Sequence, residues 1–192
     1  MSESHDEQVV LLDERAHAIG TAPKATVHTR ETPLHLAFSC YLLNDEGNVL
    51  LTRRALSKAT WPGVWTNSFC GHPRPGETLT SALERRAEFE LGAHVRTIES
   101  ALDDFRYRAT DASGIVENEI CPVFTATLDG TIHPNPDEIA EWAWVTPSDL
   151  LHSVRSTPFA FSPWLVLQLP QLSANGALPA HQIAHAEQAV GT

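Results

Sequence analysis

A long loop that leads directly into a helix constrains the fold more than any other part of the sequence. The loop at 61–77, WPGVWTNSFCGHPRPGE, has too many turn-forming Pro and Gly residues for regular structure, yet it is rich in reactive side chains. Apolar residues then recur at four-residue spacing, at Leu79, Leu83, Ala87 and Leu91. Ser81 and Glu84 suit a capping box, and Gly92 can end the helix. The sequence therefore predicts a functional loop followed by a helix over about 78–91.

Predicted strands surround this loop and helix. Runs typical of strands, bounded by turn residues, occur at 8–13, 34–43, 94–100, 103–110 and 117–129. NDEG at 44–47 predicts a hairpin, and DASG at 111–114 predicts a turn between the two strands around it. A strand and a short helix are predicted over 138–154, and a closing helix over 157–169. Strands interrupted by few helices predict an α+β domain with α/β/α layers.

The length and charge of the chain limit its organisation and its partners. A chain of 192 residues, 42% of them hydrophobic, predicts a single domain over 1–192, with mobile ends at 1–7 and about 170–192. Its start is polar and acidic, unlike a signal peptide, and no apolar stretch reaches membrane-spanning length. A net charge of −11 without a basic stripe argues against nucleic acid. We therefore expect a cytoplasmic monomer that binds neither nucleic acid nor a membrane.

Five side chains are candidate metal ligands. His28 and His35 lie in TVHTRETPLHLAF, and His72 lies in the loop. Glu117 and Glu119 alternate in IVENEICPVF, so in a strand they point to the same face. Three imidazoles and two carboxylates suit a divalent transition ion or Mg²⁺. The alternatives are isolated structural histidines and a solvated pair of glutamates.

The cysteines and a short cationic run differ in what they predict. The three cysteines lie far apart without CxxC spacing, which favours neither a disulfide framework nor a thiolate zinc site. Cys40 and Cys121 are predicted to be buried strand residues, whereas Cys70 lies in the functional loop. The run TRRALSK, 52–58, is either a local anion site or a solvated turn.

The spacing of Gly, Glu and Arg residues from the loop into the helix resembles that of the Nudix superfamily. Gly71 is followed after five residues by Glu77 and after seven more by Arg85, with Glu90 and Gly92 further along. The resemblance implies a Nudix-like mixed β-sheet flanked by helices.

Two positions depart from the Nudix pattern. Arg86 and Phe89 stand where Nudix hydrolases carry glutamates, and only Glu90 remains of the carboxylates that would hold several Mg²⁺ ions. This difference argues against routine diphosphate hydrolysis. Arg86 and Glu90 share a helix face, where they either form a surface salt bridge or, if the helix borders the site, meet a phosphate and a metal ion.

Five separated blocks together resemble the type I isopentenyl-diphosphate isomerases, in which the blocks appear in the same order. They are HTRETPLHLAFS, LTRRALSK, WPGVWTNSFCGHP, FRYRATDASGIVENEICPVF and TPFAFSPW. The match covers about residues 8–168 and is specific, because five blocks must agree. The resemblance implies an enzyme that interconverts isopentenyl diphosphate and dimethylallyl diphosphate, with a prenyl diphosphate as its small-molecule substrate.

The resemblance also implies the roles of individual residues. The Mn²⁺ or Zn²⁺ site corresponds to His28, His35, His72, Glu117 and Glu119. The positions that contact the diphosphate correspond to Lys24, Arg54, Lys58 and Arg86. The family's second ion, Mg²⁺, is bound with the diphosphate, and here it would touch Glu90 and the main-chain carbonyl of Cys70.

The catalytic pair implied by the resemblance is Cys70 and Glu119. Moving the double bond requires one group that adds a proton and another that removes one, on opposite sides of a flat substrate. We assign Glu119, helped by Tyr107, to protonation in the forward direction and Cys70 to deprotonation, with the roles exchanged in the return direction. Trp164 corresponds to an aromatic residue that stabilises carbocation character; its alternative role is that of a core anchor.

Two other functions fit parts of the sequence. A Nudix diphosphohydrolase that acts on a nucleotide or prenyl diphosphate would release phosphate without an allylic product. A non-catalytic metal- or ligand-binding module would keep its function when Cys70 is replaced by Ala. Incubation of the protein and of Cys70→Ala with isopentenyl diphosphate and Mg²⁺ tests both alternatives.

Overall fold

Two β-sheets share a pair of long parallel segments in the computed structural model, which describes residues 7–178. In one segment β3 (His35–Leu36) continues as β4 (Phe38–Leu43), and in the other β10 (Val116–Ile120) continues as β11 (Val123–Asp129). β3 pairs with β10 and β4 pairs with β11, both in parallel. The stretches predicted as single strands at 34–43 and 117–129 are therefore each divided between the two sheets.

The remaining strands extend each sheet from this shared pair. The five-stranded sheet has the order β2-β1-β3-β10-β9 and adds β1 (Gln8–Leu12), β2 (Ala18–Pro23) and β9 (Arg106–Thr110). The larger sheet has the order β12-β5-β4-β11-β8 and adds β5 (Val49–Arg54), β8 (His94–Leu102) and β12 (Ile139–Val145). Two short strands of the predicted loop, β6 (Trp65–Thr66) and β7 (Phe69–Gly71), pair with β5 and β4. Parallel and antiparallel pairs together make the mixed sheet that the sequence predicts.

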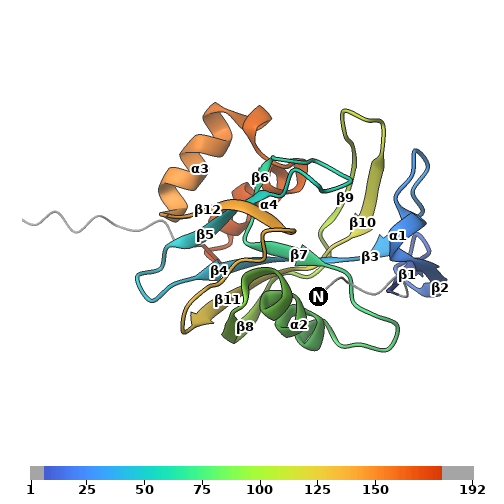
Figure 1. Ribbon diagram of the computed structural model, residues 1–192, viewed down its shortest axis with the longest axis horizontal. Coiled ribbons are helices and arrows are strands. Elements are labelled where there is room, and N and C mark those ends of the chain that lie inside the picture. Colours follow the sequence, from blue (N-terminus) through green and yellow to red (C-terminus); the bar gives the residue numbers. More distant parts are fainter. Residues whose placement is uncertain (1–6, 179–192) are drawn as a thin grey trace, which may run out of the picture.

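Helices cover both faces of the larger sheet, as Figure 1 shows. On one face lies α2 (Leu79–Leu91), and on the other lie α3 (Pro147–Ser156) and α4 (Pro163–Ala174). Shorter helical turns are α1 (Lys24–Val27) and η1 (Pro158–Ala160). This arrangement confirms an α+β fold with α/β/α layers. Within the described residues, no helix has both the length and the apolar character needed to cross a membrane.

The ends of α2 show how the sequence sets its limits. Thr78 is the N-cap, and its side chain accepts a hydrogen bond from the main-chain N–H of Ser81. The predicted capping box at Ser81 and Glu84 was therefore wrong, because Ser81 lies inside the helix as the donor. Gly92 ends the helix in the left-handed conformation, at φ 55°, as predicted.

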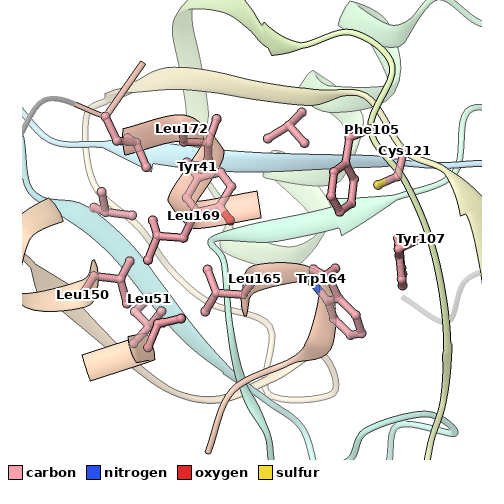
Figure 2. Packing of buried hydrophobic residues seen from close by; sticks show 14 of the residues in the cluster. Tyr41, Leu51, Phe105, Tyr107, Cys121, Leu150, Trp164, Leu165, Leu169 and Leu172 are labelled. Carbon is pink, nitrogen blue, oxygen red and sulfur yellow. The ribbon is translucent and has the colours of Figure 1, made fainter. Parts of the chain in front are cut away.

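The strand β4 is buried on both faces, which divides the core in two. Phe38, like Cys40 and Leu42, packs with Leu83 and Leu91 of α2. Tyr41 points the other way, into a cluster formed with residues of α3 and α4 (Figure 2). The labelled members of this second cluster include Leu51, Leu150, Trp164, Leu165, Leu169 and Leu172. The larger sheet is thus fixed from both sides, and the segments on it are held rigidly.

Packed structure continues into both stretches that were predicted to be mobile, 1–7 and 170–192. α4 continues through Pro170 to Ala174, and Leu172 and Leu178 are buried. Proline costs a helix one hydrogen bond, but the burial of leucines around it outweighs that loss. Glu7 is also buried. The prediction was wrong for these residues, and the rest of both ends, 1–6 and 179–192, lies outside the described residues.

Candidate active site

One cleft of about 350 Å³ gathers nearly all of the predicted site residues. Its lining includes Lys24, His28, Arg54, Lys58, Cys70, His72, Arg86, Glu90, Tyr107, Glu117, Glu119 and Trp164. These come from both sheets, from α1, α2 and α4, and from the loops between them. His35 is fully buried directly behind the lining. The predicted residues are therefore neighbours in space, although they are spread over the whole sequence.

Four side chains form a buried group of metal-ligand atoms in one part of the cleft. His28, His35, His72 and Glu119 each offer one ligand atom, and these atoms lie within 4.8 Å of one another. The pairing of β10 with β3 puts Glu119 beside His35. Glu119 Oε1 lies 3.2 Å from Nε2 of His72 and 3.4 Å from Nε2 of His35. We call this group the His–Glu cluster.

The His–Glu cluster has the chemistry of a metal site. Among residues 7–178, the buried His28 Nε2 and His72 Nδ1 have no hydrogen-bond partner. Burial, followed by the neighbouring imidazoles, lowers the pKa of His28 to about 3, so its ring is neutral and a nitrogen lone pair is available. Neutral imidazoles with one carboxylate suit a divalent transition ion. The residues present therefore fit such an ion.

Glu117 lies beside the His–Glu cluster and is not one of its four members. The Tyr107 hydroxyl donates to Glu117 Oε2 at 2.6 Å and to Glu119 Oε2 at 2.9 Å, and Thr60 donates to Glu117 Oε1 at 2.7 Å. Burial and then the charge of Glu119 raise the pKa of Glu117. Burial acts in the same direction on Glu119, but hydrogen bonds from the two imidazoles outweigh it and hold the pKa of Glu119 well below its usual range. The pKa values of the two carboxylates are therefore shifted in opposite directions.

Cys70 lies on β7, where it faces Ser39 of β4. Its Sγ is 3.4 Å from Ser39 Oγ and 3.3 Å from Asn67 Oδ1. Burial raises the pKa of the thiol to about 12, against the effect of these two hydrogen bonds. As a residue Cys70 is half-buried, whereas Cys40 and Cys121 are buried as predicted. Cys70 therefore has the one thiol that lines the cleft.

Aromatic rings close the cleft near Cys70. Trp164 is 2% exposed, and its ring centroid lies 5.8 Å from that of Tyr107 and 5.5 Å from that of Trp61. Figure 2 shows Trp164 and Tyr107 at the same end of the buried cluster. Trp164 is therefore a core residue, as its predicted alternative role requires, and its ring also lines the cleft.

In another part of the cleft, cations and carboxylates form ion pairs. Lys24 Nζ lies 2.8 Å from Glu7 Oε2, and Lys58 forms an ion pair with Glu138. Arg86 Nη2 lies 2.5 Å from Glu90 Oε1 and 3.5 Å from Glu138 Oε2. All of these carboxylates also line the cleft. We call this part the charged end.

Arg86 is buried at the charged end, which excludes one of its two predicted situations. Its side chain is 3% exposed, so the pair with Glu90 is not a surface salt bridge. Gly71 makes room for it, because a Cβ atom at this position would lie 2.7 Å from Arg86 Cγ and 2.9 Å from the Phe38 ring. The helix α2 therefore borders the cleft.

Arg54 donates hydrogen bonds to the loop at Thr60 and Trp61, mostly to main-chain oxygens. Its guanidinium donates to the carbonyl oxygens of Thr60, at 2.9 and 3.1 Å, and of Trp61, at 3.2 Å. Its Cζ lies 5.6 Å from the centroid of Trp164. Arg54 thus lies between Thr60, which also donates to Glu117, and the ring of Trp164.

Sequence reasoning missed several polar residues of the site. They are Glu7, Ser39, Thr60, Asn67, Glu138 and Gln168. Asn67 lies in the loop that the sequence marks as functional, so its position carried some signal. The pairs of Glu7 and Glu138 with distant lysines follow no periodic pattern, and a single sequence therefore does not reveal them.

The fold and the family model define the class of protein. A model described as NUDIX domain matches residues 33–165. A NUDIX hydrolase structure from Burkholderia pseudomallei has a TM-score of 0.56 at 23% identity and covers 72% of this chain and 97% of that chain. A structure from Deinococcus radiodurans has a TM-score of 0.68 at 21% identity, with 87% and 99% covered. At these identities the structures show the fold alone, which is that of a Nudix domain.

Curated relatives give the particular family. A protein named isopentenyl-diphosphate Delta-isomerase from Paenarthrobacter aurescens is 62% identical over 90% of this chain and 94% of its own length. A protein of the same name from Leifsonia xyli is 60% identical, with 92% and 97% covered. The chain belongs to the isopentenyl-diphosphate Delta-isomerases, within the NUDIX domain family.

Proposed function

We propose that the protein interconverts isopentenyl diphosphate and dimethylallyl diphosphate by adding and removing protons, in isoprenoid biosynthesis. The observation that carries the proposal is that the thiol of Cys70, the carboxylate of Glu119 and four cationic side chains share one cleft. An alkene whose double bond moves needs a proton donor and a proton acceptor, and a diphosphate needs cations. The relatives that bear the isomerase name support the same conclusion.

In the proposed forward direction, Glu119 protonates the alkene with help from Tyr107, and Cys70 removes a proton from the carbon beyond the branch point. The Tyr107 hydroxyl contacts Glu119 at 2.9 Å, within reach of proton exchange. The pKa shifts of the two groups leave the proton on Cys70 and leave Glu119 ionised. The return direction requires this distribution of the proton. The forward direction instead starts with the proton on Glu119 and with Cys70 as the thiolate.

The aromatic rings have a part in the proposed chemistry. Protonation produces carbocation character, which the face of Trp164 would stabilise by about 0.5–2 kcal/mol. Trp164 and Tyr107 are both almost fully buried, so they also exclude water that would quench the cation.

At the charged end, Lys24, Arg54, Lys58 and Arg86 would bind the diphosphate. Three of these cations already have carboxylate partners, Glu7, Glu138 and Glu90, which hold their side chains at the cleft. Oxygen atoms of the diphosphate would add to these contacts or replace them.

Divalent ions complete the proposed site. We propose Mn²⁺ or Zn²⁺ at His28, His35, His72, Glu117 and Glu119, and Mg²⁺ at Glu90 and the main-chain carbonyl of Cys70. When bound, the first ion supplies positive charge that favours the ionised form of Glu119, and the second neutralises diphosphate charge.

Proton NMR of isopentenyl diphosphate in D₂O with enzyme, Mg²⁺ and Mn²⁺ tests the proposal. We expect dimethylallyl diphosphate to form with deuterium in it, and Cys70→Ala to abolish this while its circular dichroism stays that of the wild type. Release of phosphate without an allylic product would instead establish the diphosphohydrolase. Turnover that survives Cys70→Ala would remove Cys70 from the mechanism.

We also propose that residues 1–192 form one catalytic domain that acts as a cytoplasmic monomer and binds neither nucleic acid nor a membrane. The net charge of −11 supports this, because it opposes binding to phosphate-rich surfaces. Light scattering during size-exclusion chromatography should give the mass of one chain, 21.1 kDa. Twice that mass would contradict the monomer.

A further inference from the structure

Asn67 is a fully buried amide that lies next to the cleft and does not line it. It stands between β6 and β7. Its Nδ2 donates to the main-chain oxygens of Cys40, at 3.0 Å, and Phe69, at 2.9 Å. Because only the NH₂ group of an amide can donate to carbonyl oxygens, these two bonds fix which way the amide points. Its Oδ1 therefore faces the opposite direction.

Oδ1 of Asn67 accepts hydrogen bonds from three donors that belong to different elements. They are Nε1 of Trp164 at 2.8 Å, Sγ of Cys70 at 3.3 Å and Oγ1 of Thr66 at 2.9 Å. Trp164 is on α4 and Cys70 on β7, so one oxygen atom joins two side chains from opposite parts of the chain. Both side chains line the cleft.

We propose that Asn67 is a positioning residue that sets the thiol of Cys70 and the indole of Trp164 at a fixed place relative to each other. This inference rests on the proposed isomerase function, in which the first group moves a proton and the second stabilises the cation. A proton transfer depends steeply on distance and angle, so a thiol that rotates away loses rate without loss of substrate binding.

A second set of hydrogen bonds holds the other side of the thiol. Ser39 Oγ contacts Cys70 Sγ at 3.4 Å and accepts from Gln168 Nε2 at 3.0 Å. The Tyr41 hydroxyl donates to Gln168 Oε1 at 3.0 Å, which fixes the orientation of that amide too. Cys70 Sγ is thus held between Ser39 and Asn67, and Asn67 is the member that also reaches Trp164.

The neighbouring Ser68 provides a matched control. Its Oγ donates to the main-chain oxygen of Leu50 at 2.7 Å and accepts from the main-chain N–H of Leu42 at 2.7 Å. Ser68 is as buried as Asn67 and anchors the same segment to the sheet. These two side-chain hydrogen bonds involve neither Cys70 nor Trp164. Ser68→Ala therefore removes a structural anchor and leaves the proposed positioning intact.

Steady-state isomerisation by Asn67→Ala, Asn67→Asp and Ser68→Ala is the first test. We expect Asn67→Ala to lower kcat about 100-fold with KM unchanged, because substrate contacts remain while the reacting groups lose their alignment. Asn67→Asp, whose buried carboxyl in its neutral form keeps one carbonyl oxygen and one donor, should recover at least about tenfold of that loss. Ser68→Ala should keep the kcat of the wild type even if its melting temperature falls as far as that of Asn67→Ala.

An NMR readout makes the inference independent of turnover. The indole N–H proton of Trp164, assigned with Trp164→Phe, should shift upfield in Asn67→Ala, stay in place in Ser68→Ala and return towards its wild-type position in Asn67→Asp. An unshifted indole, or a folded Asn67→Ala with wild-type kcat, would overturn the inference. If Asn67→Ala does not fold, Asn67→Ser, whose shorter side chain also lacks the amide oxygen, takes its place: a shifted indole and a lower kcat at unchanged KM support positioning, and an unchanged indole and kcat refute it. A wild-type protein without isomerase activity would instead defeat the proposed function, and the indole shift would still report the hydrogen bond.

Discussion

The His–Glu cluster and the charged end differ in how their buried polar groups are partnered. In the His–Glu cluster, His28 Nε2 and His72 Nδ1 are buried without a hydrogen-bond partner among the described residues. At the charged end, by contrast, Arg86 is as deeply buried and forms ion pairs with Glu90 and Glu138. A buried polar atom without a partner costs free energy, whereas a buried charge that has partners is stable only while they remain.

This difference indicates which end depends on a ligand. The His–Glu cluster has two ring nitrogens available to the metal ion proposed above, so its contribution to stability should appear when that ion binds. The charged end is complete in the chain itself, so the fold should depend on it even in the absence of ligands. The variants below test this division, from the largest expected effect to the smallest.

Glu119→Gln should have the largest effect, because Glu119 is a member of the His–Glu cluster and the proposed proton donor. Loss of a group that transfers a proton lowers rates by about 10²–10⁴-fold, so we expect turnover to fall at least about 1,000-fold. The NMR assay in D₂O measures it, with the exposed Glu99→Gln on β8 as the control. Turnover within tenfold of the wild type would exclude Glu119 from proton transfer.

Arg86→Met should be the most destabilising of these variants in the absence of ligands. It leaves Glu90 without its Arg86 partner and removes one of the cations beside Glu138. Loss of one partner of a buried ion pair costs about 3–5 kcal/mol, which urea unfolding would show as a lower midpoint. The control is Arg96→Met, which removes a pair with Asp45 at the surface and should change little. Equal losses in both variants would contradict the division between the two ends.

His28→Phe should behave in the opposite way. It keeps a ring that packs against His35 and His72, whose centroids lie 5.1 and 5.6 Å away, and it removes the nitrogen without a partner. Without metal we expect a free energy of unfolding equal to or above that of the wild type. Mn²⁺ at about 100 times its Kd should stabilise the wild type by about 2.7 kcal/mol, and His28→Phe much less.

Thermal unfolding with Mn²⁺ and with EDTA measures both parts of this prediction. His152→Gln, on the exposed face of α3, is the control and should respond to Mn²⁺ as the wild type does. A His28→Phe variant that is destabilised without metal would mean that the nitrogen has a structural role of its own.

The sequence predicts the His–Glu cluster better than the charged end, for a physical reason. Alternation in a strand puts Glu117 and Glu119 on one face, and the parallel pairing of β10 with β3 then brings Glu119 to His35. Ion pairs across long sequence separations leave no such period. Lys58 and Glu138 are 80 residues apart, and no sequence pattern around either residue predicts that the two form a pair.

Where packing overrides local patterns, the sequence also misleads. The run at 34–43 has continuous strand character, yet the chain passes from one sheet to the other at Ala37. The helix α4 continues through Pro170 because Leu169 and Leu172 are buried against the sheet. Both outcomes depend on partners that the segment itself does not contain.

Glu7→Gln should have the smallest effect, and one that depends on pH. Burial raises the pKa of Glu7, but the hydrogen bond from Lys24 and the charges of Lys24 and Arg85 outweigh it, so the pKa in the folded protein is below 4.5. The stability that this carboxylate contributes is therefore complete above about pH 4.5 and is lost as the pH falls through the folded pKa. At pH 7 we expect Glu7→Gln to lose about 1–2 kcal/mol, since its Lys24 and Arg85 partners are partly exposed.

Urea unfolding of both proteins between pH 7 and pH 3 isolates this contribution, because all other groups titrate equally in the two. The difference in free energy should shrink towards pH 3. Glu141→Gln, which removes a pair with Arg53 at the surface, should cost less than about 0.5 kcal/mol and serves as the control. A difference between Glu7→Gln and the wild type that stays constant with pH would mean that Glu7 acts through shape and not through charge. The stability that the charged end contributes would then come from the ion pairs of Arg86 and not from the carboxylate partner of Lys24.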